Sequence, residues 1–183
     1  MFGISLGIID SGGAGGGGGS YESLASTVGT GSSNTITFSS ISSSYKHLQI
    51  RGIVFNSTGD YLYLQVNSDT GNNYSQHFLH GTGSSVAAGG SASTSYFRFD
   101  NLNSSTAASN GDVFIIDLID YASTTKNKTM RALAGIDTNG AGTITLSSSA
   151  WLNTSAINSI TIGTINSNNF STTTRISLYG IKG

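Results

Sequence analysis

The longest hydrophobic stretch of the chain lies in its second half and predicts a β-hairpin. Residues 113–121 read Val-Phe-Ile-Ile-Asp-Leu-Ile-Asp-Tyr, a run rich in the β-branched and aromatic residues that favour strands. A polar bend over residues 122–128 follows, and residues 129–135 then alternate between two faces. No other segment is as hydrophobic for as long, so we expect this antiparallel hairpin to form the centre of a sheet. Asp117 could then pair with Arg131 across its two strands, as a buried or half-buried ion pair.

Shorter segments with period-two alternation succeed one another from Tyr21 to the end of the sequence. Each is bounded by Gly, Ser, Asn or Asp, which favour turns. The predicted strands are residues 34–38, 47–55, 61–66, 75–79, 95–99, 113–121, 129–135, 143–146, 157–162 and 175–180. Asn139-Gly140 predicts a tight turn, because both residues accept a positive φ. Alternation up to residue 181 predicts that the last strand lies inside a sheet.

The composition of the chain also points away from helices. Hydrophobic residues make up 37% and charged residues only 9%, far below the usual quarter, and Ser, Thr, Asn and Gly fill the difference. These residues disfavour helices, because they compete for backbone hydrogen bonds or leave the backbone too free. About ten short strands predict an all-β fold, an antiparallel, jelly-roll-like β-sandwich. We expect a single domain over residues 21–183.

The first twenty residues have a different pattern and predict a docking arm on a tether. Apolar side chains alternate with Gly and Ser, and the apolar set comprises Phe2, Ile4, Leu6, Ile8 and Ile9. Seven of the ten residues 11–20 are Gly and the others are Ser or Ala, a composition typical of flexible tethers. We therefore expect the arm to dock on a neighbouring copy or on another protein. The alternative is a disordered terminus, and the missing basic flank argues against a secretory signal.

Several classes of function are disfavoured by charge and residue content. A net charge of −1 provides no basic surface for nucleic acid, and the chain has no cysteine for disulfides, thiolate metal sites or cysteine nucleophiles. No apolar run is long enough for membrane insertion. His77 and His80 would point to opposite faces of a strand, and residues 67–73 lack the bidentate Glu of a calcium loop, so an Asx-type turn is expected there. We therefore predict no cofactor, no metal and no catalytic residues.

Two groups of residues remain as candidates for chemistry or recognition. A glycan hydrolase would need two carboxylates in one cleft, chosen from Glu22, Asp117, Asp120 and Asp137. Exposed aromatic side chains would stack on sugar rings and face a receptor; the candidates are Tyr61, Tyr63, Tyr74, Tyr96 and Trp151. The alternative for the aromatic set is that its members fill the faces of the sheets.

Several stretches of the domain resemble a family of small virion proteins of tailed bacteriophages, common in phages of aquatic bacteria. The similar stretches are residues 21–25, 38–52, 69–74, 117–122, 128–135 and 179–183, which include Asp69-Thr-Gly-Asn-Asn-Tyr74 and the terminal Tyr-Gly-Ile-Lys-Gly. They comprise turns and core strands and carry no catalytic signature. The resemblance implies a phage structural protein, described in this family as structural or tail-fibre-like. The first ten residues lie outside it.

The expected function is therefore that of a non-enzymatic virion component, assembled in the host cytoplasm. We expect an accessory head decoration or cement protein, anchored to capsid or tail proteins by its arm and present as a homo-oligomer; the guess is a trimer, because virion surface proteins are usually symmetric. The alternative is a tail-fibre or tail-tip module that recognises a host surface glycan or protein. Its contacts would come from Gly-, Ser- and Asn-rich loops at residues 67–73, 81–95 and 101–111.

Overall fold

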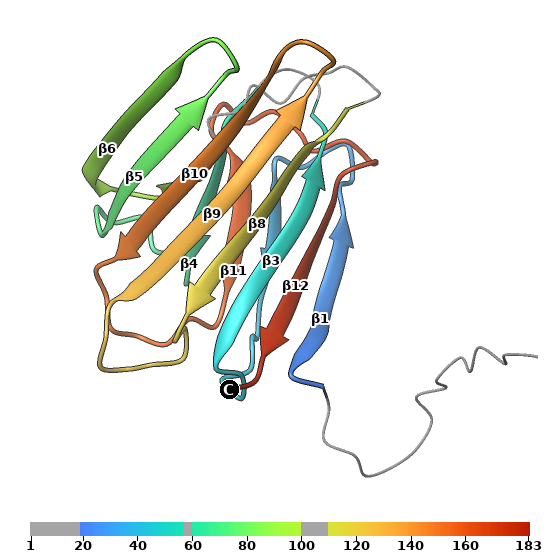
Figure 1. Ribbon diagram of the computed structural model, residues 1–183. Helices are drawn as coiled ribbons and strands as arrows, with labels where there is room; N and C mark the ends of the chain where they lie inside the picture. Colours follow the sequence, from blue (N-terminus) through green and yellow to red (C-terminus); the bar gives the residue numbers. More distant parts are fainter. Residues whose placement is uncertain (1–18, 57–59, 100–109) are drawn as a thin grey trace, which may run out of the picture.

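The computed structural model describes residues 19–56, 60–99 and 110–183, which form two antiparallel sheets (Figure 1). The strands within these residues are β1 (Tyr21–Val28), β2 (Thr35–Phe38), β3 (His47–Val54), β4 (Leu62–Val66), β5 (Tyr74–Gly81), β6 (Val86–Thr94), β7 (Phe97–Arg98), β8 (Asp112–Ile119), β9 (Lys128–Asp137), β10 (Gly142–Trp151), β11 (Ile160–Thr164) and β12 (Arg175–Ile181). The predicted all-β sandwich is confirmed. The predicted arm and the greater part of the predicted loop 101–111 lie outside the described residues.

The predicted hairpin is the centre of the larger sheet. The eight-stranded sheet has the order β1-β12-β3-β8-β9-β10-β5-β6, so β8 and β9 are its two middle strands. The last strand, β12, lies between β1 and β3, as its alternation predicts. The four-stranded sheet has the order β2-β11-β4-β7 and lies behind the large sheet in the view of Figure 1. One face of the large sheet is therefore covered and the other faces outward.

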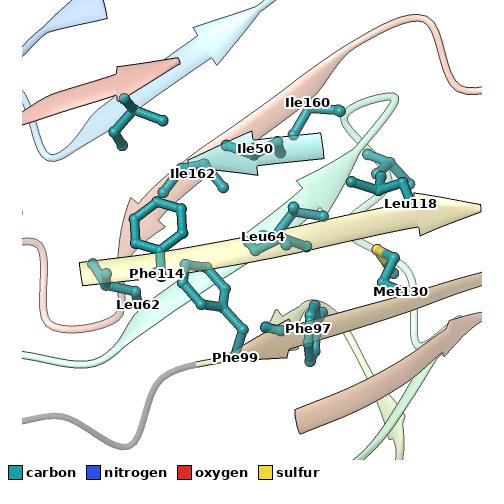
Figure 2. Close-up of a cluster of buried hydrophobic side chains, with 14 of the residues drawn as sticks. Ile50, Leu62, Leu64, Phe97, Phe99, Phe114, Leu118, Met130, Ile160 and Ile162 are labelled. Atoms are coloured by element: carbon teal, nitrogen blue, oxygen red, sulfur yellow. The ribbon is translucent and has the colours of Figure 1, made fainter. Parts of the chain in front are cut away.

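The core fills the space between the two sheets, and the central strands contribute alternate residues to it. Figure 2 shows aliphatic and aromatic side chains of both sheets meeting there. The large sheet contributes Ile50, Phe114, Leu118 and Met130, and the small sheet contributes Leu62, Leu64, Phe97, Ile160 and Ile162. All of them are at most 3% exposed. Because a shift of one residue would turn every one of these side chains outward, this alternation fixes the register of the strands.

The connections on either side of β9 were both predicted from the sequence. Asn139 and Gly140 both have positive φ, at 60° and 109°, so the predicted turn is confirmed. The connection between β8 and β9 spans residues 120–127, whereas the bend was predicted over residues 122–128, because β8 ends at Ile119 and the buried Lys128 is the first residue of β9. Its Nζ donates to the carbonyls of Lys126 and Thr154, at 2.7 and 3.0 Å, and these bonds offset the loss of water.

The sequence prediction missed the two edge strands of the large sheet. β6 occupies most of residues 81–95, which were predicted to be a loop because they are rich in Gly, Ala, Ser and Thr. Its residues pair with β5, although most of their side chains are exposed and bury little. β1 likewise carries few large apolar residues, and among the described strands it pairs only with β12. Edge strands bury less surface than central ones, so hydrophobic periodicity does not find them.

Candidate functional site

The outward face of the large sheet carries a continuous group of exposed aliphatic side chains, which we call the apolar face. It comprises Ile53, Leu79, Val86, Val113, Ile115, Leu133, Ile144 and Leu146. The register places Leu79, Leu146, Leu133 and Ile115 opposite one another on β5, β10, β9 and β8. A second row runs from Val86 through Ile144 and Val113 to Ile53.

The size of the apolar face is unusual for a protein that works alone. The exposed fraction of its members runs from 37% at Ile53 to 77% at Val86. Eight neighbouring aliphatic side chains that are each more than a third exposed form one contiguous patch, whereas monomeric proteins rarely expose large contiguous apolar patches. No described strand covers this side of the sheet, as Figure 1 shows. The hydrophobic effect therefore favours a second molecule on it.

A hollow of about 790 Å³ lies over part of the apolar face, at the end of the sheet where the β9–β10 turn is. Gly135 lies between Ile144 and Val113 in the register and adds no side chain to the surface there. The hollow is also lined by Leu133, and glycines of the neighbouring turns, Gly83 and Gly140, form part of its rim. An aliphatic or aromatic side chain of a partner would fit such an apolar hollow.

A polar network lies on the same outward face, beside the aliphatic rows. Gln49 accepts bonds from Tyr21 Oη and Arg51 Nε, each at 2.8 Å, and donates to Asp117 Oδ1 at 2.8 Å. Arg131 pairs with Asp117 at 3.2 Å, which confirms the predicted cross-strand pair. The Arg131 side chain is 67% exposed, so the pair lies at the surface and contributes little to stability.

Three of the predicted receptor-facing tyrosines come together on the outside of the four-stranded sheet. The rings of Tyr63 and Tyr96 are 5.3 Å apart, and the Arg98 guanidinium lies 5.1 Å from the centre of the Tyr61 ring. The Tyr63 ring packs over Gly163, where a Cβ atom would approach it to 2.5 Å. Burial, and then the nearby Tyr96, raise the pKa of the Tyr63 hydroxyl. These partly exposed rings form an aromatic surface with a polar rim.

The other two predicted receptor-facing residues are in the core, so that part of the prediction is wrong. Tyr74 and Trp151 are 0% and 1% exposed. Tyr74 Oη accepts the amide of Val66 at 3.0 Å, and Trp151 Nε1 donates to Asp69 Oδ2 at 2.7 Å. Because their polar atoms have partners inside the protein, both rings can be buried at little cost. Sequence alone did not reveal those partners.

The four candidate carboxylates of a hydrolase are held by four different sets of partners. Asp117 binds Gln49 and Arg131 on the outward face, as described above. Glu22 accepts from Tyr45 and Lys182, at 2.6 and 2.7 Å, and Asp120 pairs with Lys46 and Lys126, at 3.2 and 3.1 Å. Asp137 accepts the amide of Asn139 in the β9–β10 turn. The hydrogen bonds to Lys126 and Lys46 lower the pKa of Asp120, so it is an anion at neutral pH.

The histidines and the loop at residues 67–73 match their structural expectations. His77 is exposed on the outward face, whereas His80 points inward and its Nδ1 lies 3.1 Å from Thr145 Oγ1. Asp69 Oδ1 accepts the amide of Gly71 at 2.8 Å, which is the predicted Asx-type turn. Among the described residues, no three His, Cys, Asp or Glu side chains are grouped to hold a metal ion. The described part of the chain also has no helix with the length and apolarity to cross a membrane.

The members of the apolar face were not among the functional residues expected from the sequence. A signal was present: in the run 113–121, Val113 and Ile115 are apolar on one face while Phe114 and Ile116 are apolar on the other. A strand that is apolar on both faces is typically covered on both sides. Only the arrangement of the sheets shows that one side of β8 stays uncovered by the described strands.

No protein-family model and no curated protein matches the chain. Among solved structures, the galectin LEC-6 of Caenorhabditis elegans is similar with a TM-score of 0.35 and 7% identity, over 86% of this chain and 96% of that chain. The tripod (BppUct-A-L) from the baseplate of bacteriophage Tuc2009 is similar with a TM-score of 0.26 and 13% identity, over 100% of this chain and 80% of that chain. Both likenesses are weak, and neither assigns the chain to a family.

Proposed function

We propose that the protein is a non-enzymatic structural component of a tailed bacteriophage virion, an accessory head decoration or cement protein. The observation that carries the proposal is the apolar face, because a surface of this kind is typical of proteins that act within an assembly. Resemblance of the turns and core strands to small virion proteins supports the same class. The domain would be held on the particle by its N-terminal arm and would bury the apolar face against other subunits.

The mechanism is passive burial at several weak sites. Apolar surface contributes about 25 cal/mol per Å² when it leaves water, but association also costs translational and rotational freedom. One arm and one face therefore give modest affinity for a single copy. Linked copies rebind at high local concentration, so an oligomer would be retained much more strongly than a monomer.

The proposal is tested on purified particles. We expect the protein to co-purify with them, and a count of copies distinguishes hundreds on a head from a handful on a tail. Deletion of residues 2–10 should leave a folded domain that no longer joins the particle. Replacement of Leu133 and Ile144 by Lys should weaken incorporation, whereas the outward-facing Thr129→Lys on the same strand as Leu133 should not. Absence of the protein from purified particles would exclude the proposal.

A second candidate function is receptor binding at a fibre or tail tip, and the cluster of Tyr61, Tyr63 and Tyr96 favours it. Aromatic rings beside an Arg and hydroxyl side chains suit the apolar and polar faces of sugars. The purified protein would then bind host cells or host glycans, and Tyr96→Ala would weaken this binding. Tyr179→Ala on the outside of the other sheet is the matched control. Unchanged binding by Tyr96→Ala would assign the contact to another surface.

A further inference from the structure

The two edges of the eight-stranded sheet differ in how they are protected against further pairing. β1 carries Glu22, which binds Lys182, and a register shift between Ser23 and Ala25. β6 consists of Val, Ala, Gly, Ser and Thr only, with no charged residue and no proline from Gly81 to Tyr96. Charges, prolines and bulges are the usual means of keeping an edge strand from pairing. The only irregularity of β6 is near its C-terminal end, where the pairing shifts between Tyr74 and Gln76 of β5.

The unprotected part of β6 is also the border of the apolar face. Ala88 lies opposite Leu79 and Val86 lies opposite Gly81, so the two aliphatic rows run out to this edge. Val86 is the most exposed large apolar side chain of the described residues, at 77%. A strand added beside β6 would bond to its free backbone groups and would extend the rows if its own outward side chains were apolar. The edge therefore selects a short strand with one apolar face.

We infer that the β6 edge of one copy accepts the N-terminal arm of a neighbouring copy as a ninth strand. Residues 2–9 are long enough to pair with the part of β6 that precedes its register shift. Phe2, Ile4, Leu6 and Ile8 would fall on one face of such a strand. Small Gly and Ser residues fall on the other. This inference rests on the proposed docking role of the arm and names its acceptor.

The distances favour an arm from another copy over the arm of the same chain. β1 and β6 are the two opposite edges of the sheet, as Figure 1 shows. Eight strands at about 4.8 Å spacing separate the edges by roughly 34 Å. A glycine-rich chain of the length of residues 10–20 has a root-mean-square span of roughly 18 Å. To reach its own β6, the tether would need to be almost fully stretched, at a high cost in conformational entropy.

Exchange of this kind is heterologous, because the arm of each copy binds a different surface on the next. Such contacts close into a ring when the rotation between copies allows it, and otherwise continue as an open chain of subunits. A closed ring of three is the form that matches the trimer expected from the sequence. On a particle, the same contact would link each decorating subunit to its neighbour.

Disulfide trapping tests the contact directly, because the native chain contains no cysteine. A Leu6→Cys protein and an Ala88→Cys protein carrying tags of different size are mixed and mildly oxidised, and Ile4→Cys covers the neighbouring register. We expect a mixed disulfide between the two differently tagged chains. The control is Ser26→Cys, since Ser26 lies in the same transverse row as Ala88 but on the opposite edge strand. Equal trapping at Ser26 and Ala88, or none at Ala88, would overturn the inference.

A second measurement separates this inference from the proposed function. Ala88→Lys places a charge on the edge, and Ser26→Lys is its control on β1. We expect Ala88→Lys and deletion of residues 2–10 each to reduce the solution mass measured by light scattering to that of a monomer. The arm binds another protein if the deletion gives a monomer or prevents incorporation while Ala88→Lys does neither. In that case the inference fails and the proposed function stands. If the Ala88→Cys protein forms the mixed disulfide but the protein is absent from purified particles, the inference stands and the proposed function fails.

Discussion

Trp151 donates its indole N–H to Asp69 Oδ2 across 2.7 Å and so joins the end of β10 to the turn between β4 and β5. The same carboxylate accepts bonds from the Asn73 amide, at 2.9 Å, and from the backbone of Gly71. Burial raises the pKa of Asp69, but the bonds from Trp151, Asn73 and Gly71 outweigh it and leave the pKa lowered. Asp69 thus links the buried indole to a turn at the surface.

Replacement of Asp69 by Ala should destabilise the protein substantially. It removes the acceptor of the buried Trp151 N–H and two further bonds to a charged group, so we expect a loss of about 2–4 kcal/mol in the free energy of unfolding. Urea unfolding measures the loss, with the fluorescence of the single tryptophan as the signal. Asp137→Ala is the control, because Asp137 forms an Asx-type bond in an exposed turn. Equal losses for the two variants would contradict the role assigned to Asp69.

Tyr74 should make the protein sensitive to alkaline pH. Burial raises the pKa of its hydroxyl from 10.0 to about 12. The unfolded chain therefore releases this proton at lower pH than the folded protein does, so stability is complete below pH 10 and declines as the pH rises toward about 12. The free energy of unfolding, measured at several alkaline pH values, should fall less steeply in Tyr74→Phe. An unchanged slope would show that other tyrosines dominate.

Replacement of Leu133 by Lys on the apolar face should change the behaviour of the protein without unfolding it. Leu133 is 48% exposed, so the change in the free energy of unfolding should stay within about 1 kcal/mol. Binding of a hydrophobic dye to the native protein and its tendency to aggregate should both decrease. Leu64→Ala in the core should instead cost about 2–5 kcal/mol. A large loss of stability in Leu133→Lys would mean that this face is part of the core.

Gly163 has no side chain, and the Tyr63 ring occupies the space where its Cβ atom would be. In Gly163→Ala the new Cβ would approach the ring to 2.5 Å, so Tyr63 must move and we expect a loss of about 1–3 kcal/mol. The Tyr63→Ala variant removes the ring, so Gly163→Ala should cost much less in that background. A double-mutant cycle by urea unfolding measures this coupling. Additive losses would show that Tyr63 does not need the space above Gly163.

Much of the fold followed from local pattern because burial of alternate residues leaves a period-two signal. Residues 113–121 and 129–135 were predicted as the two strands of the central hairpin, and β8 and β9 occupy that place. The predicted ion pair between Asp117 and Arg131 followed from the same register. The period-two signal is weak in strands whose side chains are mostly exposed. Residues 86–94 were therefore predicted as part of a loop, although they form a nine-residue strand.

The sequence by itself determined that this protein is a β-sandwich, since Ser-, Thr- and Asn-rich segments with alternating apolar residues disfavour helices. Only the tertiary structure decided which side of each strand is covered. Val113 and Phe114 are both apolar, yet one is 51% exposed and the other 3%, because the four-stranded sheet packs against one face of the larger sheet alone. Tyr74 and Trp151 were likewise assigned to the core only when the strands placed Val66 and Asp69 beside their polar atoms. These partners lie on other strands or turns, 8 residues from Tyr74 and 82 residues from Trp151, and local periodicity carries no information about them.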